Sequence, residues 1–332
     1  MHAEPTDTRP VVLLTDHVHS AAHARLQQNA RILMIPPGLS AVQADDRLRE
    51  LLQQADGLIV RRPLPGDIFD TSNSLRAVVR HGAGVDFIPV DHATKRGIPV
   101  ANVPGANANA VAEYAIAAML AASRRLADFD RHIRSQAWHM RSSASATAIE
   151  LRNRTLGIVG YGAIGSRIAD IACNGFGMNV LAQTNSPSKL PRHVSSASLQ
   201  DIVSVCDFVV LACPLTPRTE GMINASVLAH ANGRLVLINV ARGAIVREDD
   251  LVRALDAGKL GGAVLDVFET EPLPPDSPLR RHSRVILTPH LAGVTQDSER
   301  ALGLASVDTI LALLRGNCHP NIVNPSFAEH LG

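Results

Sequence analysis

Three glycines, Gly160, Gly162 and Gly165, are spaced as G-x-G-x-x-G between an apolar run and an amphipathic helical stretch. The first glycine permits a tight turn, the second lets a pyrophosphate approach the backbone, and the third allows the helix to lie close to the strand. The N–H groups at the start of the helix, at Ala163 and Ile164, then face the phosphates. Because the motif lies inside a strand–turn–helix–strand unit, it favours a dinucleotide site over a merely structural glycine turn.

The segment after the second strand of this unit lacks the acid that normally binds the ribose diol of NAD. No Asp or Glu occurs between Asp170 and Asp201. The strand is followed instead by Thr184, Asn185 and Ser186 and then by basic residues, and such groups can donate to a 2′-phosphate without repelling it. We therefore expect NADP to be preferred to NAD. A polar loop that tolerates either cofactor is the alternative.

Short β-branched or aliphatic runs recur between helical patterns along the whole chain. The predicted strands are residues 11–14, 57–60, 77–79, 156–159, 179–181, 208–212, 235–239, 262–265 and 285–287. Strands that are apolar throughout and separated by helices indicate parallel sheets covered on both faces. The strands form two series, separated by a long periodic segment at 109–133 that we expect to be one helix. This pattern predicts an α/β protein with two doubly wound parallel-sheet domains.

A second periodic stretch, at 297–314, follows the last predicted strand. If it packs on the first sheet, a Rossmann cofactor domain at 106–294 is inserted in a flavodoxin-like, discontinuous substrate domain made of 1–105 and 295–332. Spacing alone does not decide this. A length of 332 residues suits two domains.

Composition excludes several classes of protein. Lys and Arg together number 32 against 31 for Asp and Glu, so no positive field exists that would gather nucleic acid or a membrane surface. No apolar run approaches the ~18 residues of a membrane span, and the N-terminus lacks a signal pattern. The four cysteines form no C-x-x-C pair, and no H-E-x-x-H occurs. We expect a cytoplasmic protein with a small-molecule substrate and no metal, nucleic-acid or membrane partner.

Polar groups follow several of the later predicted strands, at the sheet edge where ligands collect in open α/β folds. These segments are Asn239–Gly243, Leu265–Pro272 and Thr288–Gly293. Together with Gly82-Ala-Gly-Val-Asp86, which precedes them in the chain, they resemble the D-isomer-specific 2-hydroxyacid dehydrogenases over nearly the whole chain. The resemblance is to short forms related to phosphoglycerate dehydrogenase and hydroxypyruvate reductase. It implies an NAD(P)-dependent oxidoreductase acting on the CH–OH group of a 2-hydroxy acid, or reducing the 2-keto acid.

The resemblance implies a catalytic set of Arg242, Glu271 and His290. Reduction of a 2-keto acid needs a cation to hold the carboxylate and polarise the carbonyl, and an acid to protonate the alkoxide. A guanidinium grips a carboxylate through two parallel hydrogen bonds, and a carboxylate on the second histidine nitrogen favours imidazolium and fixes the ring. Glu271, directly before Pro272, matches the family's carboxylate. The purely structural alternatives are that Arg242 is a surface arginine at the start of a helix, that Glu271 only caps the proline turn, and that His290 is an ordinary buried histidine.

Further contacts are implied by the resemblance alone. Cofactor contacts are expected at Cys213, Pro214, Thr219, Val240, Ala241, Asp266 and Gly293, with Asp266 accepting from the nicotinamide carboxamide. Substrate contacts are expected at Arg61 and at Ala83, Gly84 and Val85, where successive N–H groups form an anion nest. Arg61 matches an arginine of the phosphoglycerate dehydrogenase branch, whereas Arg62 departs from that branch, so the substrate stays open.

The long segment at 109–133 carries more apolar surface than one domain core needs, and relatives use this region to dimerise. We therefore expect a homodimer. Trp138 lies in a segment that is near the dimer interface in the family, although an ordinary packing role is equally consistent with the sequence. Two other functions remain open: a dinucleotide-sensing, corepressor-like interaction protein, and oxidation of a non-hydroxyacid donor such as phosphite or formate.

Overall fold

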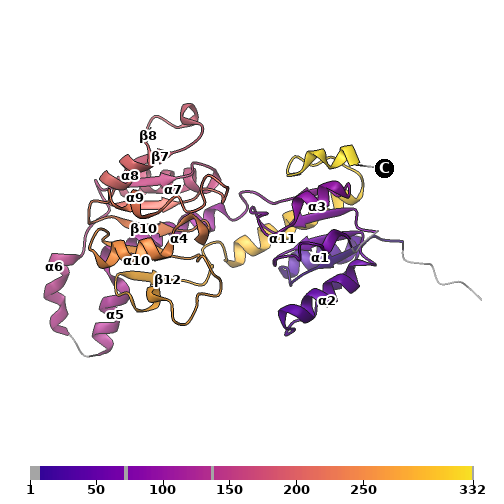
Figure 1. The fold of residues 1–332 in the computed structure, drawn as a ribbon, viewed down its shortest axis with the longest axis horizontal. Helices are drawn as coiled ribbons and strands as arrows, with labels where there is room; N and C mark the ends of the chain where they lie inside the picture. Colours follow the sequence, from indigo (N-terminus) through magenta and orange to yellow (C-terminus); the bar gives the residue numbers. More distant parts are fainter. Residues whose placement is uncertain (1–7, 71–73, 136–137, 331–332) are drawn as a thin grey trace, which may run out of the picture. The chain divides into compact units, whose positions relative to one another are not determined.

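The computed structural model describes residues 8–70, 74–135 and 138–330. The chain divides into two compact units, one containing residues up to Asn107 and from Val294 onward, the other Ala108–Gly293. Each unit is an α/β layer structure around one parallel sheet, which confirms the predicted fold class (Figure 1). In these described ranges no helix is long and apolar enough to cross a membrane.

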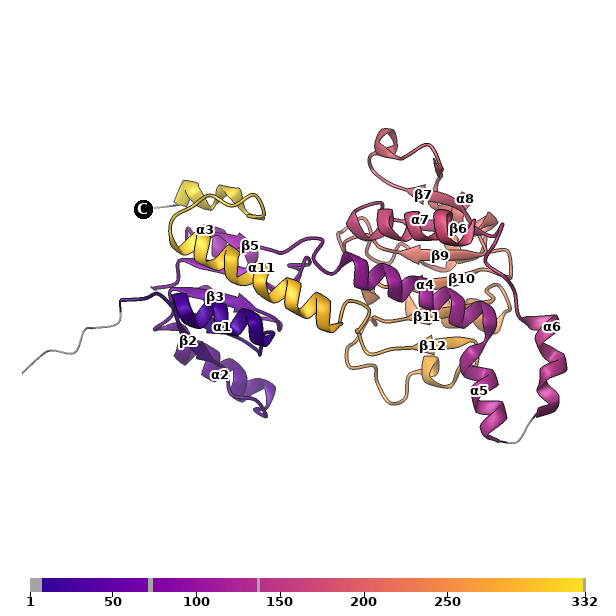
Figure 2. The same cartoon turned by 180° about the vertical axis from the view of Figure 1, so that it is seen from behind.

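The first unit is built on a five-stranded parallel sheet. Its strands lie in the order β2 (Arg31–Met34), β1 (Val11–Leu14), β3 (Gly57–Val60), β4 (Ala77–Arg80) and β5 (Val100–Ala101). Its helical elements are α1 (Ser20–Asn29), α2 (Ala41–Leu52), η1 (Ile68–Asp70), α3 (Val90–Lys95), α11 (Gln296–Leu314) and η6 (Pro325–His330). Helices α1 and α11 pack side by side on one face (Figure 2), where Leu26 and Ile310 are buried with Val12. Helices α2 and α3 cover the other face, around Leu48 and Ala93.

The second unit is built on a seven-stranded parallel sheet. Its strands lie in the order β12 (Val285–Leu287), β11 (Gly262–Leu265), β10 (Val236–Asn239), β9 (Phe208–Leu211), β6 (Thr155–Val159), β7 (Asn179–Gln183) and β8 (Val194–Ser196). The chain leaves β6 in one direction and returns at β9 to build the other half. Ligands of such sheets bind at the carboxyl ends of the strands where the order reverses. The carboxyl ends of β6 and β9 are therefore the expected cofactor edge.

Helices cover both faces of this second sheet. One face carries α4 (Ala108–Arg124) and α7 (Ala163–Phe176), and the other carries α8 (Leu199–Val205), α9 (Ala225–Leu228) and α10 (Glu248–Asp256), as the two views show (Figures 1 and 2). The remaining short helical elements are α5 (Leu126–Arg134), η2 (Trp138–Ser143), α6 (Ala144–Thr147), η3 (Pro187–Lys189), η4 (Gly243–Ile245) and η5 (Pro278–Arg281). The two clusters of apolar side chains so formed, one on each face, position the loops at the sheet edge.

The segment expected to be one helix is two helices, so that expectation is wrong. Arg125 adopts a left-handed conformation, with φ of 50°, and separates α4 from α5. Helix α4 buries an apolar face against the sheet, whereas α5 buries none of its residues. The apolar periodicity continues past the bend because Leu126 and Ile133 are apolar although they face solvent. Periodicity therefore did not mark the break.

Every strand predicted from the sequence is present, with ends that differ by a residue or two. Strands β2, β5 and β8 were not predicted. All of them lie at sheet edges and are short or partly polar, as in the Val-Ser-Ser of β8. An edge strand is not enclosed on both sides, so it needs no continuous apolar run and leaves a weaker signal.

Candidate active site

The glycine loop between β6 and α7 is tight at its ends and open in its middle. Gly160 has φ of +98°, and a Cβ atom there would lie 2.6 Å from the backbone nitrogen of Cys213. A Cβ at Gly165 would lie 2.1 Å from the carbonyl oxygen of Gly160, whereas one at Gly162 would meet nothing within 4 Å. The open middle is where a pyrophosphate approaches the backbone. The loop therefore fits the dinucleotide that the sequence motif predicts.

Donors for the phosphates are present at the start of α7. Within the residues that the structure describes, the N–H groups of Ala163 and Ile164 donate to no protein acceptor. Uncapped N–H groups at a helix N-terminus bind anions because the helix dipole adds to their partial charge. No side chain caps this terminus at Gly162. The site thus has its anion donors without a protein group competing for them.

The segment after β9 lies beside the glycine loop and is held by Thr219. The Thr219 hydroxyl donates to the carbonyl of Pro214 at 2.7 Å and accepts from the N–H of Thr216 at 2.8 Å. Cys213 contributes the backbone that packs against Gly160. Burial raises the pKa of the Cys213 thiol to about 11, so the thiol stays protonated at neutral pH. Cys213 therefore lies beside the glycine loop, and Pro214 and Thr219 lie in the segment that follows it; cofactor contacts were expected at all three.

The segment after β7 carries the groups that would face the adenosine ribose. The N–H of Gly160 donates to the carbonyl of Gln183 at 3.0 Å, which joins the end of β7 to the glycine loop. Thr184 closes the following turn by accepting from the N–H of Ser186 at 3.2 Å. In the described part of the chain, the exposed side chains of Lys189 and Arg192 form no ion pair. Both cations are available to an anionic ligand.

His290 and Glu271 form the pair that was expected from the sequence. His290 Nδ1 lies 2.8 Å from Glu271 Oε2, and the other oxygen, Oε1, accepts from the N–H of Phe268 at 3.1 Å. The side chains of His290 and Glu271 are 51% and 38% exposed. The histidine is therefore not an ordinary buried one, and the nitrogen that does not face Glu271 is left for other chemistry. A cavity of about 570 Å³ adjoins the pair, between Leu273 and Pro289.

Asp266 holds the turn that carries His290. It is 1% exposed, and its Oδ1 accepts from the Thr288 hydroxyl at 2.6 Å and from the N–H of Leu291 at 2.9 Å. Its Oδ2 accepts from the N–H of Ala292 at 2.8 Å. A carboxylate has about four acceptor positions, so one remains for a carboxamide. The sequence suggested that Asp266 contacts the cofactor, but it did not predict that Asp266 positions the His290 turn.

Arg242 follows β10 in a turn organised by Asn239. The Asn239 amide donates to the carbonyl of Arg242 at 2.9 Å and accepts from the N–H of Ala241 at 3.1 Å. A Cβ at Gly243 would lie 1.8 Å from the carbonyl carbon of Phe268, so only glycine fits there. The turn that carries Arg242 therefore packs directly against the segment that leads to Glu271. The guanidinium also donates from Nη1 to the carbonyl of Ala241 at 2.7 Å.

The loop after β4 supplies donors in the first unit. In the part of the chain that is described, the N–H groups of Ala83, Gly84 and Val85 have no protein acceptor. The carbonyl of Ala83 accepts from the Asn102 amide at 2.6 Å, which fixes the loop from the other side. Successive unoccupied N–H groups form a concavity suited to an anion. The loop has the form expected of a carboxylate site.

Arg80 positions this loop, and sequence reasoning missed it. Its guanidinium donates to the carbonyls of His81, Val60 and Gly84, the last two at 3.1 Å, and stacks 4.5 Å from the ring centroid of Phe87. A charged residue at the end of an apolar strand was the available signal. Its function is visible only in three dimensions because these three acceptors are backbone carbonyls.

His81 lies at the base of the same loop. It is 4% exposed, and its Nε2 has no hydrogen-bond partner in the described structure. Burial, assisted by the nearby charge of Arg61, lowers the pKa of His81 to about 3. His81 is therefore neutral at physiological pH and is not a candidate for acid–base chemistry.

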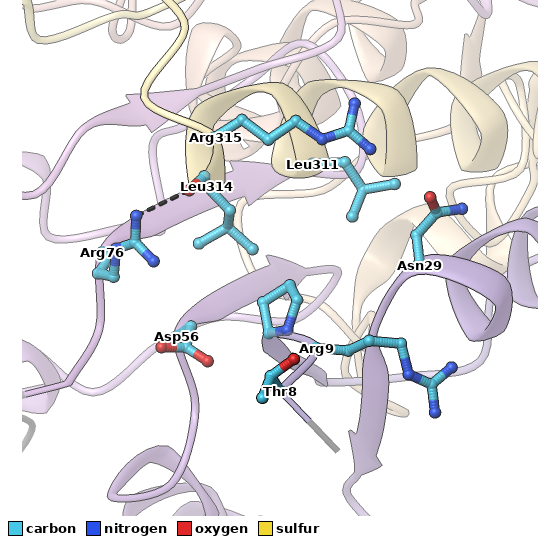
Figure 3. Close-up of a pocket in the computed structure, with 9 residues that line it drawn as sticks. Thr8, Arg9, Asn29, Asp56, Arg76, Leu311, Leu314 and Arg315 are labelled. Carbon is cyan, nitrogen blue, oxygen red and sulfur yellow. Dashed lines mark hydrogen bonds between the residues drawn. The ribbon is translucent and has the colours of Figure 1, made fainter. Parts of the chain in front are cut away.

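A further cavity in the first unit lies at the opposite edge of its sheet. It has a volume of about 260 Å³ and is lined by Asp56, Arg9, Arg76 and Arg315 among others (Figure 3). Arg76 donates to the carbonyl of Leu314 at 2.7 Å, and Figure 3 shows the guanidinium groups spread around the cavity rather than converging. Residues before β1, β3 and β4 line it, so within this unit it lies at the other edge of the sheet from the loop after β4.

Comparison with known proteins identifies the family. A family model, "D-isomer specific 2-hydroxyacid dehydrogenase, NAD binding domain", matches residues 116–292. The chain belongs to the D-isomer-specific 2-hydroxyacid dehydrogenase family. It is therefore an oxidoreductase that uses a nicotinamide dinucleotide, and the resemblance seen in its motifs is confirmed.

Two curated members of the family illustrate the range of relatives. A glyoxylate reductase of Korarchaeum cryptofilum is 35% identical over 281 residues, covering 83% of this chain and 84% of the relative. A D-3-phosphoglycerate dehydrogenase of Methanocaldococcus jannaschii is 34% identical over 94% of this chain. The chain spans only 59% of that relative's length.

A solved structure has the same fold. It is an NADPH-dependent glyoxylate/hydroxypyruvate reductase of Sinorhizobium meliloti, in complex with NADP and malonate. The two chains are 29% identical, with a TM-score of 0.83 and coverage of 97% and 98%.

Proposed function

We propose that this dehydrogenase interconverts a small 2-keto acid and the D-2-hydroxy acid, with a substrate of the glyoxylate, hydroxypyruvate or phosphoglycerate type. The observation that carries the proposal is the contact of 2.8 Å between His290 Nδ1 and Glu271 Oε2. It fixes the ring and leaves the second nitrogen of an exposed imidazole for proton transfer. A buried or unpaired histidine would not serve as the acid.

Each residue of the candidate site has its own role in the proposed reaction. A bound nicotinamide supplies the hydride for reduction. His290 gives its proton to the carbonyl oxygen as the alcohol forms, and takes a proton from the hydroxyl in the reverse reaction. Arg242, in the second unit, holds the substrate carboxylate and polarises the carbonyl. In the first unit, the N–H groups of Ala83, Gly84 and Val85 offer a nest suited to a carboxylate. Glu271 stabilises the protonated form of His290.

We propose further that NADP is the preferred cofactor. The segment from Thr184 to Ser186 offers hydroxyl and amide groups and no carboxylate, and Lys189 and Arg192 follow it. A carboxylate at this place would repel a 2′-phosphate, whereas cations attract it. The name of the Sinorhizobium meliloti relative, an NADPH-dependent enzyme, agrees with this choice.

We also propose that the chain forms a homodimer through the segment from α4 to η2. The side chains of Leu126, Ile133 and Trp138 are 58%, 46% and 72% exposed, although all three are large and apolar. Large apolar side chains gathered on one segment typically mark an interaction surface. Sedimentation at micromolar concentration should give a dimer, and a stable monomer would remove this part of the proposal.

A substrate panel tests the proposed activity. The purified chain is assayed with a series of 2-keto acids and with NADPH or NADH, following the loss of reduced-nicotinamide absorbance. We expect at least one small 2-keto acid to be reduced, and we expect the His290→Ala variant to lose most of that turnover while still binding the cofactor. A wild-type chain that binds NADPH but reduces no 2-keto acid contradicts the proposal.

A further inference from the structure

Arg61, at the carboxyl end of β3, is held by an acidic partner within its own unit. Its Nη1 donates to the carbonyl of His17, and its Nη2 lies 2.8 Å from Glu299 Oε2. The side chains of Arg61 and Glu299 are only 25% and 22% exposed, so the pair is largely shielded from water. Shielding strengthens both the attraction within the pair and any repulsion that Glu299 exerts on a third charge.

The other arginines at this edge of the sheet are also engaged. Arg62 Nη2 lies 3.5 Å from Asp45 Oδ1, and Arg80 donates to the carbonyls of Gly84 and Val60. Among the residues described, the backbone N–H groups of the loop 83–85 are donors that remain unoccupied there. Such a nest suits one carboxylate. It carries no full positive charge with which to hold a second anionic group.

Glu299 is fixed in place by its position in α11. The helix begins with a capping box in which the Thr295 hydroxyl accepts from the N–H of Ser298 at 3.0 Å. Glu299 lies in the first turn, where the helix dipole stabilises a carboxylate. Farther along the helix, Leu302 and Ile310 are buried against the sheet. The carboxylate is therefore anchored by the fold and cannot be displaced at low cost.

We propose that Glu299 is a specificity-determining residue that withholds Arg61 from phosphorylated substrates. The substrate is then an unphosphorylated 2-keto acid with a single carboxylate, such as glyoxylate or hydroxypyruvate. A phosphate adds about two negative charges at neutral pH, and one that approaches Arg61 meets the carboxylate of Glu299. Repulsion between like charges therefore weakens the binding of a phosphorylated acid more than the binding of an acid with a single carboxylate. The inference rests on the proposed function, whose substrate type it narrows.

The kinetic test compares two variants that make the same change in net charge. Glu299→Gln releases Arg61, and Asp45→Asn releases Arg62 as a matched control. For each, kcat/KM is measured with hydroxypyruvate and with phosphohydroxypyruvate. We expect the ratio of phosphorylated to unphosphorylated kcat/KM to rise about tenfold or more in Glu299→Gln and less than about threefold in Asp45→Asn. A wild-type chain that already reduces the two acids equally well, or variants that shift the ratio equally, would overturn the proposal.

A binding measurement separates this inference from the proposed activity. Calorimetric titration of 3-phosphoglycerate into the NADPH-loaded chain involves no turnover, because a hydroxy acid and the reduced cofactor do not react with each other. We expect Glu299→Gln to bind it about tenfold more tightly than wild type, and the double variant with Arg61→Gln to lose that gain. If no 2-keto acid is reduced, the proposed activity fails, yet the titration still decides the role of Glu299. Equal dissociation constants in wild type and Glu299→Gln would overturn that role.

Discussion

His290 and Glu271 are joined by a contact of 2.8 Å between Nδ1 and Oε2, and Glu271 is itself held by the N–H of Phe268. The carboxylate therefore has one oxygen on the backbone and the other on the imidazole. This arrangement fixes which histidine nitrogen faces the reacting oxygen. It also places a negative charge where it stabilises the protonated ring.

Replacing Glu271 with glutamine should shift the pH dependence of the reaction. Glu271→Gln keeps the shape but removes the charge that favours imidazolium, so the limb of the reduction profile should move to lower pH. Reduction requires protonated His290 and oxidation requires the neutral ring, so oxidation near neutrality should suffer less. The overall loss should be about 10²- to 10⁴-fold. The measurement is kcat/KM against pH in both directions.

The neighbouring acid gives a matched control for that experiment. Glu269 accepts from the N–H of Glu248 at 3.1 Å and does not contact His290. Glu269→Gln should leave the pH limb where it is in the wild type. An unshifted profile in Glu271→Gln would mean that Glu271 is only a structural turn residue.

An acid introduced after β7 should change the cofactor preference. Wild type should favour NADPH, and Thr184→Asp should move the preference towards NADH because the new carboxylate repels the 2′-phosphate and accepts from a free ribose diol. Thr184→Asn, which adds no charge, should shift the preference much less. The ratio of kcat/KM for NADPH to that for NADH is the measurement. A wild-type chain that favours NADH by about tenfold would refute our interpretation of this segment.

Two glycines of the cofactor loop should respond differently to alanine. A Cβ at Gly165 would lie 2.1 Å from the Gly160 carbonyl oxygen, so Gly165→Ala should lower the free energy of unfolding by about 1–3 kcal/mol or more. A Cβ at Gly162 meets no protein atom within 4 Å, so Gly162→Ala should unfold like wild type but bind NADPH more weakly. Urea unfolding and cofactor titration check the pair. Equal stabilities of the two variants would contradict the packing described.

Acid should destabilise the first unit through His81. The pKa of this histidine is lowered from 6.5 to about 3, chiefly by burial. Below pH 6.5 the unfolded chain takes up a proton there and the folded chain does not, so stability is lost as pH falls towards 3. The loss is about 1.4 kcal/mol per pH unit. Urea unfolding of wild type and His81→Gln between pH 7 and pH 5 should show a flatter dependence in the variant, and parallel curves would contradict the assignment.

Much of this fold can be predicted from the sequence because its interior strands are enclosed on both sides and are therefore apolar. Buried strands such as β3 and β9 are apolar throughout, and the glycine motif marks the turn from β6 to α7. The sequence carries no comparable signal for the bend at Arg125, because the residues beyond it keep the apolar periodicity although they face solvent. Spacing also could not decide where α11 packs, since that depends on which sheet has an uncovered apolar face.

The contact between His290 and Glu271 could be predicted from the sequence, because the family motifs name both residue types. Arg242, Glu271 and His290 each follow a strand, and the contact between the last two is present. The roles of Arg80 and Glu299 were not predictable, since each depends on partners far away in the chain or on backbone carbonyls. Asp266 was assigned to the cofactor, and its hold on the His290 turn became visible only from its hydrogen bonds.

The stereochemistry of the product tests the central claim most directly. Hydroxypyruvate is reduced with NADPH by the purified chain, and the glycerate formed is resolved on a chiral column, with the His290→Ala variant run beside it. We predict D-glycerate from the wild type and almost no product from the variant. L-glycerate, or equal turnover by the two chains, would contradict a D-2-hydroxyacid dehydrogenase that uses His290 as its acid.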